Sequence, residues 1–134
     1  MFSHLCIGTR DFGRALAFYR PLLALLGVAE RFCDPDADCA GWQSTPGPRP
    51  LLVLSRPFDG EHAPGNGQMV ALLAASRAQV DAAHALALSL GGTCEGAPGP
   101  RPHYHPNYYG AYFRDTEGNK LCVACHEAPQ TTAG

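Results

Sequence analysis

NYYGAYFRDTEGNKLCVACH, residues 107–126, carries the strongest structural signal in the chain. Aromatic and apolar runs of strand length stand on both sides of Asp-Thr-Glu-Gly-Asn, a sequence that favours a tight turn. Along the first run Tyr109, Ala111 and Phe113 alternate with Tyr108, Gly110 and Tyr112, so both faces carry apolar or aromatic residues, as expected for a strand that is covered on both faces. The stretch therefore predicts a β-hairpin.

The chain resembles itself when it is shifted by 65 residues, through shared physical roles more than through identities. Each copy begins with a short apolar strand, residues 4–8 or 69–74. A helix N-cap residue follows, Asp11 or Ser76, and Ser76 with Gln79 also predicts a capping box. Apolar residues at helical spacing come next. Each helix then ends at glycines that suit a left-handed C-cap, Gly27, Gly91 and Gly92.

Three further strands follow each predicted helix. The first half contributes residues 28–33, 40–45 and 51–56, and the second contributes 93–98, 108–115 and 120–126. Two segments rich in Gly and Pro, 59–67 and 95–107, are expected to connect the halves and to form a long loop within the second half. Pro21 lies inside the first helix and predicts a kink or a break into two short helices.

The order strand, helix, three strands therefore occurs twice. Halves of about 60 residues cannot each bury a helix and both faces of a sheet. We predict an α+β fold in which two βαβββ modules, residues 1–62 and 66–128, form a pseudo-symmetric curved mixed sheet around a cavity with the helices outside. Residues 1–134 then make a single domain.

Composition narrows the class of protein. A net charge of −2 and a pI near 6.3 give no electrostatic reason to expect nucleic acid or an anionic membrane as a partner. No apolar run approaches the ~20 residues of a membrane-spanning helix, and no signal peptide is evident. We therefore expect a cytoplasmic protein whose six cysteines are reduced.

The repeat and its ending resemble the vicinal oxygen chelate superfamily, which includes glyoxalase I, extradiol dioxygenases and bleomycin resistance proteins. The resemblance lies in FYRPLLALLG (18–27), in residues 65–101 and in YYGAYFRDTEGNKLCVACH (108–126). It implies a divalent metal, Zn, Ni, Mn or Fe, which binds two neighbouring substrate oxygens as a Lewis acid. It also implies His, Glu or Gln ligands on the first and last strands of each module.

The positions that the resemblance assigns to the metal hold unusual residues here. His4 is an acceptable ligand, but the equivalent position of the second module is Met69, and the last strands carry Val53 and Cys122. A thioether, a thiol and a hydrocarbon suit a hard cation poorly. We therefore expect no metal cofactor. Gln68 can replace Met69 only if the strand register shifts by one residue.

Other residues are interpreted as walls of the predicted cavity. The full set of expected cavity and ligand-binding residues is His4, Trp42, Met69, Tyr104, His105, Tyr108, Cys122 and His126. Tyrosines in such a wall offer apolar area and a hydroxyl group. Arg101 can attract an anionic ligand. The simpler alternatives are a core position for Trp42 and solvated side chains in the Pro-rich loop.

Cys122 and Cys125 form a Cys-x-x-Cys, but in a strand the two thiols point to opposite faces. A zinc or redox role is therefore disfavoured. Arg10, Asp11, Arg114, Asp115 and Glu117 are interpreted as turn, cap and hairpin residues.

Two functions follow from these expectations. The first is a small-molecule-binding protein, or an enzyme, of the glyoxalase/bleomycin-resistance type without the usual metal site. The second is a metal-dependent lyase or dioxygenase with a rearranged ligand set, His4, Gln68 and His126. Whether the chain is catalytic stays open, and the catalytic residues are unassigned. A homodimer is expected because such modules associate through sheet edges or helices.

Overall fold

A computed structural model describes residues 1–44 and 47–129. The first half contains β1 (His4–Gly8), α1 (Phe12–Leu25), β2 (Ala29–Asp34), a short 3-10 helix (Pro35–Ala37), β3 (Cys39–Gln43) and β4 (Leu51–Ser55). The second half contains β5 (Val70–Leu73), α2 (Arg77–Ser89), β6 (Thr93–Pro100), β7 (Tyr109–Arg114) and β8 (Lys120–Cys125). The chain therefore has the predicted order of elements in both modules.

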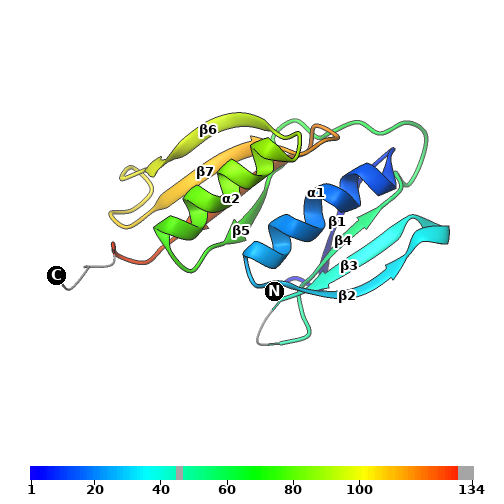
Figure 1. Cartoon of the computed structure of the whole chain (residues 1–134), viewed down its shortest axis with the longest axis horizontal. Coiled ribbons are helices and arrows are strands. Elements are labelled where there is room, and N and C mark those ends of the chain that lie inside the picture. The colour runs from blue at the N-terminus through cyan, green and yellow to red at the C-terminus, as the bar shows by residue number, and fades with distance from the viewer. Residues whose placement is uncertain (45–46, 130–134) are drawn as a thin grey trace.

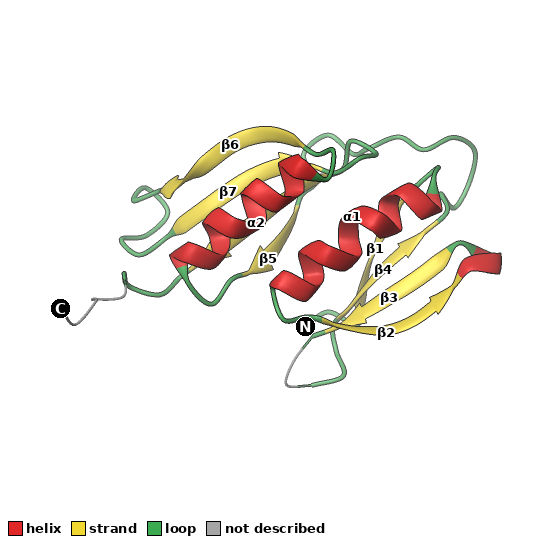
Figure 2. Cartoon of the chain, viewed as in Figure 1, coloured by secondary structure: helices red, strands yellow, loops and turns green. Residues whose placement is uncertain are grey.

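Each module builds its own four-stranded mixed sheet, with the strand orders β1-β4-β3-β2 and β5-β8-β7-β6. The first and last strands of each module pair in parallel, and the other pairs are antiparallel. Figure 1 shows the two sheets side by side, with β1 and β5 as their inner edges and both helices over the same side. The predicted α+β fold of two βαβββ modules is confirmed (Figure 2).

The strand registers also support the equivalence of the two modules. Cys6 pairs with Val53 in the first sheet, and Ala71 pairs with Cys122 in the second. A shift of 65 residues places Cys6 on Ala71. Val53 and Cys122 therefore occupy matching positions in the two modules.

The helix ends follow the local sequence. Asp11 and Ser76 are the N-caps, and their side chains accept hydrogen bonds from the N–H groups of Arg14 and Gln79. Gly27 and Gly91, just past the C-caps, have φ values of 75° and 102°, which favour glycine. Of the two outcomes expected at Pro21, a kink or a break into two short helices, the break is wrong, because α1 runs through this residue without interruption.

The core lies between the helices and the sheets. α1 contributes to both modules, since Phe18 lies 6.4 Å from Phe113 of β7 and Tyr19 lies 6.3 Å from Trp42 of β3, measured between ring centroids. All four rings are almost fully buried. Within the described residues, no helix has the length and apolar character needed to cross a membrane.

Side chains of the β7–β8 hairpin join the two modules. Glu117 accepts hydrogen bonds from the backbone N–H of Arg10 at 3.0 Å, from the Arg10 Nε–H at 3.1 Å and from the Asp11 N–H at 3.3 Å. Asp115 accepts a hydrogen bond from the Tyr19 hydroxyl. The hairpin therefore does more than turn the chain, because its acidic side chains bind the start and middle of α1.

Two sequence expectations need correction. β6 extends to Pro100, so the first part of the predicted loop 95–107 is a strand. The sheets do not close around one shared cavity, and their faces away from the helices are open. Residue 45, at the end of the predicted strand 40–45, lies outside the described residues.

Candidate functional site

The open face of the second sheet, on the side away from α2, carries a cluster of hydroxyl and thiol groups. Along β8, Leu121 and Val123 belong to the core, and Cys122 between them points to the open face. The Tyr108 hydroxyl lies 2.8 Å from that of Tyr112 and 3.5 Å from the Cys122 thiol. We call Tyr108, Tyr112 and Cys122 the hydroxyl–thiol cluster.

The members of this cluster are neutral at physiological pH. Burial raises the pKa of Tyr108, and its hydrogen bonds to Tyr112 and Cys122 raise it further. Burial likewise raises the pKa of the Cys122 thiol, although nearby donors and the positive charges of Arg101 and Lys120 oppose this effect. Burial also raises the pKa of Tyr112. The cluster therefore consists of two neutral hydroxyl groups beside a buried neutral thiol, and it contains no thiolate nucleophile.

Two positive side chains lie over the same part of the sheet. The guanidinium carbon of Arg101 lies 5.6 Å from the centre of the Tyr112 ring, and Lys120 Nζ lies 5.9 Å from it. The sequence singled out Arg101 but not Lys120. The alternation along β8 contained the missing signal, since Lys120 and Cys122 are two residues apart and share a face.

The loop after β6 covers one end of the cluster. Ring centroids of Tyr104 and Tyr108 lie 4.9 Å apart in an edge-to-face arrangement. His105 Nε2 lies 2.8 Å from His126 Nδ1, so the loop is tied to the end of β8. Five of the predicted cavity residues therefore gather here: Tyr104, His105, Tyr108, Cys122 and His126.

The other three predicted residues lie elsewhere. His4 is exposed on β1, where its Nδ1 lies 2.9 Å from the Ser3 hydroxyl. Trp42 is 2% exposed and packs against Tyr19, as its core interpretation implied. Met69 is exposed just before β5.

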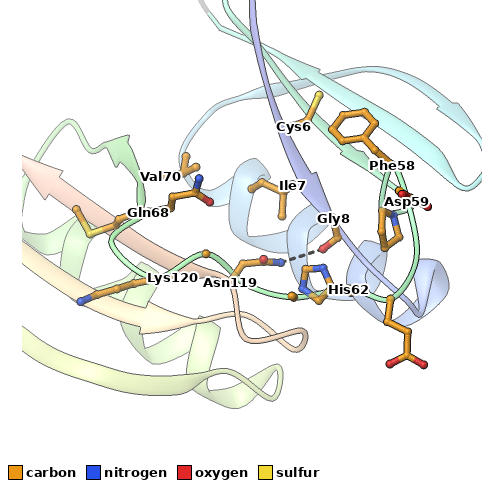
Figure 3. Close-up of a pocket in the computed structure, with 15 residues that line it drawn as sticks. Cys6, Ile7, Gly8, Phe58, Asp59, His62, Gln68, Val70, Asn119 and Lys120 are labelled. Atoms are coloured by element: carbon orange, nitrogen blue, oxygen red, sulfur yellow. Dashed lines mark hydrogen bonds between the residues drawn. The ribbon is translucent and has the colours of Figure 1, made fainter.

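Two pockets lie where the modules meet. One has a volume of about 460 Å³, and its walls include Cys6, His62, Gln68, Met69 and Lys120. Figure 3 shows His62 of the connecting segment beside Gly8 and Asn119, and the Asn119 amide donates to the Gly8 carbonyl at 3.0 Å. Lys120, which lines this pocket, also approaches the Tyr112 ring of the hydroxyl–thiol cluster at 5.9 Å.

The second pocket, of about 620 Å³, is more apolar. Leu5, Trp42 and Leu72 are among its lining residues, and His126 and Glu127 also border it. Gln68 and His126 therefore border different pockets, and His4 borders neither. The residues of the rearranged ligand set, His4, Gln68 and His126, therefore do not line a common pocket.

The donor set at the implied metal positions does not fit a hard divalent cation. Val53 supplies no donor atom, Met69 supplies only a thioether, and Cys122 is a buried thiol whose pKa is raised. Within residues 1–44 and 47–129, no group of three or more His, Cys, Asp or Glu side chains is arranged to hold a metal ion.

Comparisons with known proteins agree with the fold. The family model described as the Glyoxalase/Bleomycin resistance protein/Dioxygenase superfamily matches residues 1–123. A glyoxalase/bleomycin resistance protein from Albidiferax ferrireducens T118 is 35% identical, with a TM-score of 0.81, over 93% of this chain and 98% of that one. No match to an individually curated protein is significant.

More distant structures share the fold alone. The lactoylglutathione lyase from Agrobacterium tumefaciens is 21% identical over 93% of this chain and 92% of its own, with a TM-score of 0.64. A glyoxalase/bleomycin resistance protein/dioxygenase family enzyme from Burkholderia phytofirmans PsJN is 19% identical over 93% and 98%, with a TM-score of 0.67. On the family match and the 35% identical relative, the chain belongs to the glyoxalase/bleomycin resistance protein/dioxygenase superfamily.

Proposed function

We propose that this protein binds a small organic molecule on the open face of its second sheet without the metal ion implied by its family. The observation that carries the proposal is the hydroxyl–thiol cluster, Tyr108, Tyr112 and Cys122, at the place where a ligand carboxylate was expected. Neutral hydroxyl groups beside aromatic rings bind organic ligands through both hydrogen bonds and apolar contact.

The chemistry of the cluster favours binding and orientation over nucleophilic attack. A thiol with a raised pKa is a weak nucleophile at neutral pH. The two tyrosine hydroxyls are protonated at neutral pH, and one of their protons lies in the hydrogen bond between them. The other hydroxyl proton can be donated to a carbonyl or carboxylate oxygen. If the protein is an enzyme, polarisation of such an oxygen is the role that these groups can perform.

A thermal-shift screen of small aromatic compounds, run on metal-free protein, tests the proposal. Tyr108→Phe removes a hydroxyl from the cluster, whereas Tyr109→Phe removes a hydroxyl that donates to Asp81 at 2.6 Å, away from the cluster. Ligands that stabilise the wild type should lose affinity in Tyr108→Phe and keep it in Tyr109→Phe. Equal effects of the two variants, or binding only after a metal is added, would contradict the proposal.

The protein is also proposed to act as a cytoplasmic homodimer. Apolar side chains on the inner strands and near the N-terminus support association, because Leu73 is 71% exposed, Phe2 52% and Met69 44%. Sedimentation analysis of the wild type and of Leu73→Lys measures this directly. A wild-type monomer at micromolar concentration would reject the dimer without affecting the ligand proposal.

A further inference from the structure

We infer that the ligand of the open face is a planar aromatic carboxylate. The inference rests on the proposed function and names its ligand class. It depends on three observations at the hydroxyl–thiol cluster: the cations Arg101 and Lys120 have no carboxylate partner, backbone carbonyls hold the Arg101 guanidinium, and aromatic rings lie beside both cations.

The two cations near the cluster have no carboxylate partner. Neither Arg101 nor Lys120 takes part in the salt bridges formed within the part of the chain that the structure describes. Both approach the Tyr112 ring, and the positive charge of each lowers the pKa of the Cys122 thiol against the larger effect of burial. The cluster is therefore bordered by two positive charges that remain available to an anion.

The backbone of β6 holds the Arg101 guanidinium in place. Arg101 donates to the Ala97 carbonyl at 2.9 Å and to the Pro100 carbonyl at 3.3 Å. Gly99 leaves space for it, because a Cβ at this position would lie 3.0 Å from Arg101 Nη1. Arg101 is thus folded back over the sheet. A guanidinium has five N–H groups, so these two bonds leave donors for a carboxylate.

Aromatic rings complete the surface. Tyr112 lies under the cations, and Tyr104, which is 62% exposed, meets Tyr108 edge to face at the loop end. A flat ring can pack against these tyrosines while its carboxylate reaches Arg101 or Lys120. An aliphatic acid would keep the charge contact but lose the ring contacts. A neutral aromatic compound would keep the ring contacts but lose the charge contact.

Three probes separate these contributions when they are titrated by calorimetry into metal-free, full-length protein. They are 2-naphthoate, its uncharged analogue 2-naphthamide, and cyclohexanecarboxylate. We expect 2-naphthoate to bind at least ~10-fold more tightly than either analogue, because a charge-assisted hydrogen bond and aromatic packing each contribute on this scale. Its affinity should also fall as the salt concentration rises.

Two variants remove the cations one at a time. Arg101→Gln and Lys120→Gln should each weaken 2-naphthoate binding by ~10-fold and leave 2-naphthamide binding unchanged. Arg31→Gln is the matched control, because Arg31 is an exposed arginine on β2 of the other module. Circular dichroism verifies that each variant is folded, and Lys120→Gln provides an independent test if Arg101→Gln is unstable.

Three outcomes would overturn the inference. They are equal affinity for 2-naphthoate and 2-naphthamide, an unchanged affinity for 2-naphthoate in both cation variants, or no binding of any probe. Neutral compounds whose binding is lost in Tyr108→Phe would still support the proposed function, so failure of the ligand class and failure of the site remain distinguishable.

Discussion

Glu117→Gln tests the account of how the two modules are held together. The Glu117 side chain is 3% exposed and accepts three hydrogen bonds from Arg10 and Asp11. Glutamine keeps the shape but has only one carbonyl oxygen. Its amide N–H₂ group must then face either the Asp11 N–H or the two Arg10 donors, and at least one buried bond is replaced by a contact between donors.

The magnitude follows from these contacts. Loss of one buried hydrogen bond, with loss of charge from the others, should destabilise the protein by about 2–3 kcal/mol. At this chain length, that corresponds to a fall in Tm of roughly 6–9 °C. Glu95→Gln is the matched control, because Glu95 pairs with Arg114 at 2.6 Å where both side chains are about one-third exposed. An ion pair at such a site contributes about 0–1 kcal/mol.

Urea denaturation, followed by far-UV circular dichroism, measures both free energies of unfolding. The reasoning would be refuted if Glu117→Gln lowered the free energy of unfolding no more than Glu95→Gln.

The stabilising effect of Glu117 should also depend on pH. Burial alone would raise the pKa of Glu117, but the hydrogen bonds from Arg10 and Asp11 outweigh it and lower the pKa.

Because the pKa is lower in the folded state, Glu117 stabilises the protein above the ordinary glutamate pKa of about 4.3. This contribution should be lost as the pH falls from about 4.3 toward the folded pKa. The difference in stability between wild type and Glu117→Gln should therefore shrink below about pH 4. A constant difference between pH 3 and pH 7 would contradict the assigned role of the charge.

Two further predictions concern glycine and cysteine positions. Gly92→Ala should destabilise the protein by about 2–3 kcal/mol, because a Cβ would lie 2.8 Å from the Ala87 carbonyl oxygen. Gly13 lies in the first turn of α1, and the nearest atom to a Cβ at this position would be Asp11 Oδ1 at 3.9 Å. Gly13→Ala should therefore stabilise the protein by about 0.5–1 kcal/mol. Thermal unfolding of the two variants should show shifts in Tm of opposite sign. Cys122 should react with iodoacetamide at least ~100-fold more slowly than exposed Cys6, because the buried thiol becomes accessible only when the structure opens locally. Peptide mass spectrometry measures both rates of alkylation, and equal rates would contradict the burial of Cys122.

The hairpin and the helix ends were predictable because their signals are local. Alternation in residues 108–115 and the turn residues after it specify two strands, and Asp11 and Ser76 specify helix starts. These features depend only on neighbours along the chain. The shift of 65 residues then recovered the module equivalence that the strand registers show.

β6 was too short in the prediction because Pro98 and Gly99 usually interrupt strands. β6 lies at the edge of its sheet, where a missing N–H is tolerated, and its register shifts between Gly96 and Gly99. Pro21 is similar, since it lies on the exposed side of α1, where water can satisfy the carbonyl left without a partner.

The candidate site was recovered in part. The strand period placed Cys122 on the open face, and the same period would have added Lys120. The position of Arg101 depends on Gly99 of β6 and on the Tyr112 ring, which only the folded sheet brings together. The role of Glu117 depends on Arg10, over a hundred residues away in the chain. Local patterns carry no information about such contacts.

The central claim is that the open face binds its ligand without a metal ion. The direct measurement is elemental analysis of untagged protein purified without chelators, paired with ligand titration before and after treatment with EDTA. The account predicts substoichiometric Zn, Ni, Mn and Fe and an unchanged ligand affinity. One tightly bound metal ion per chain, lost together with ligand binding in His4→Ala, would contradict it.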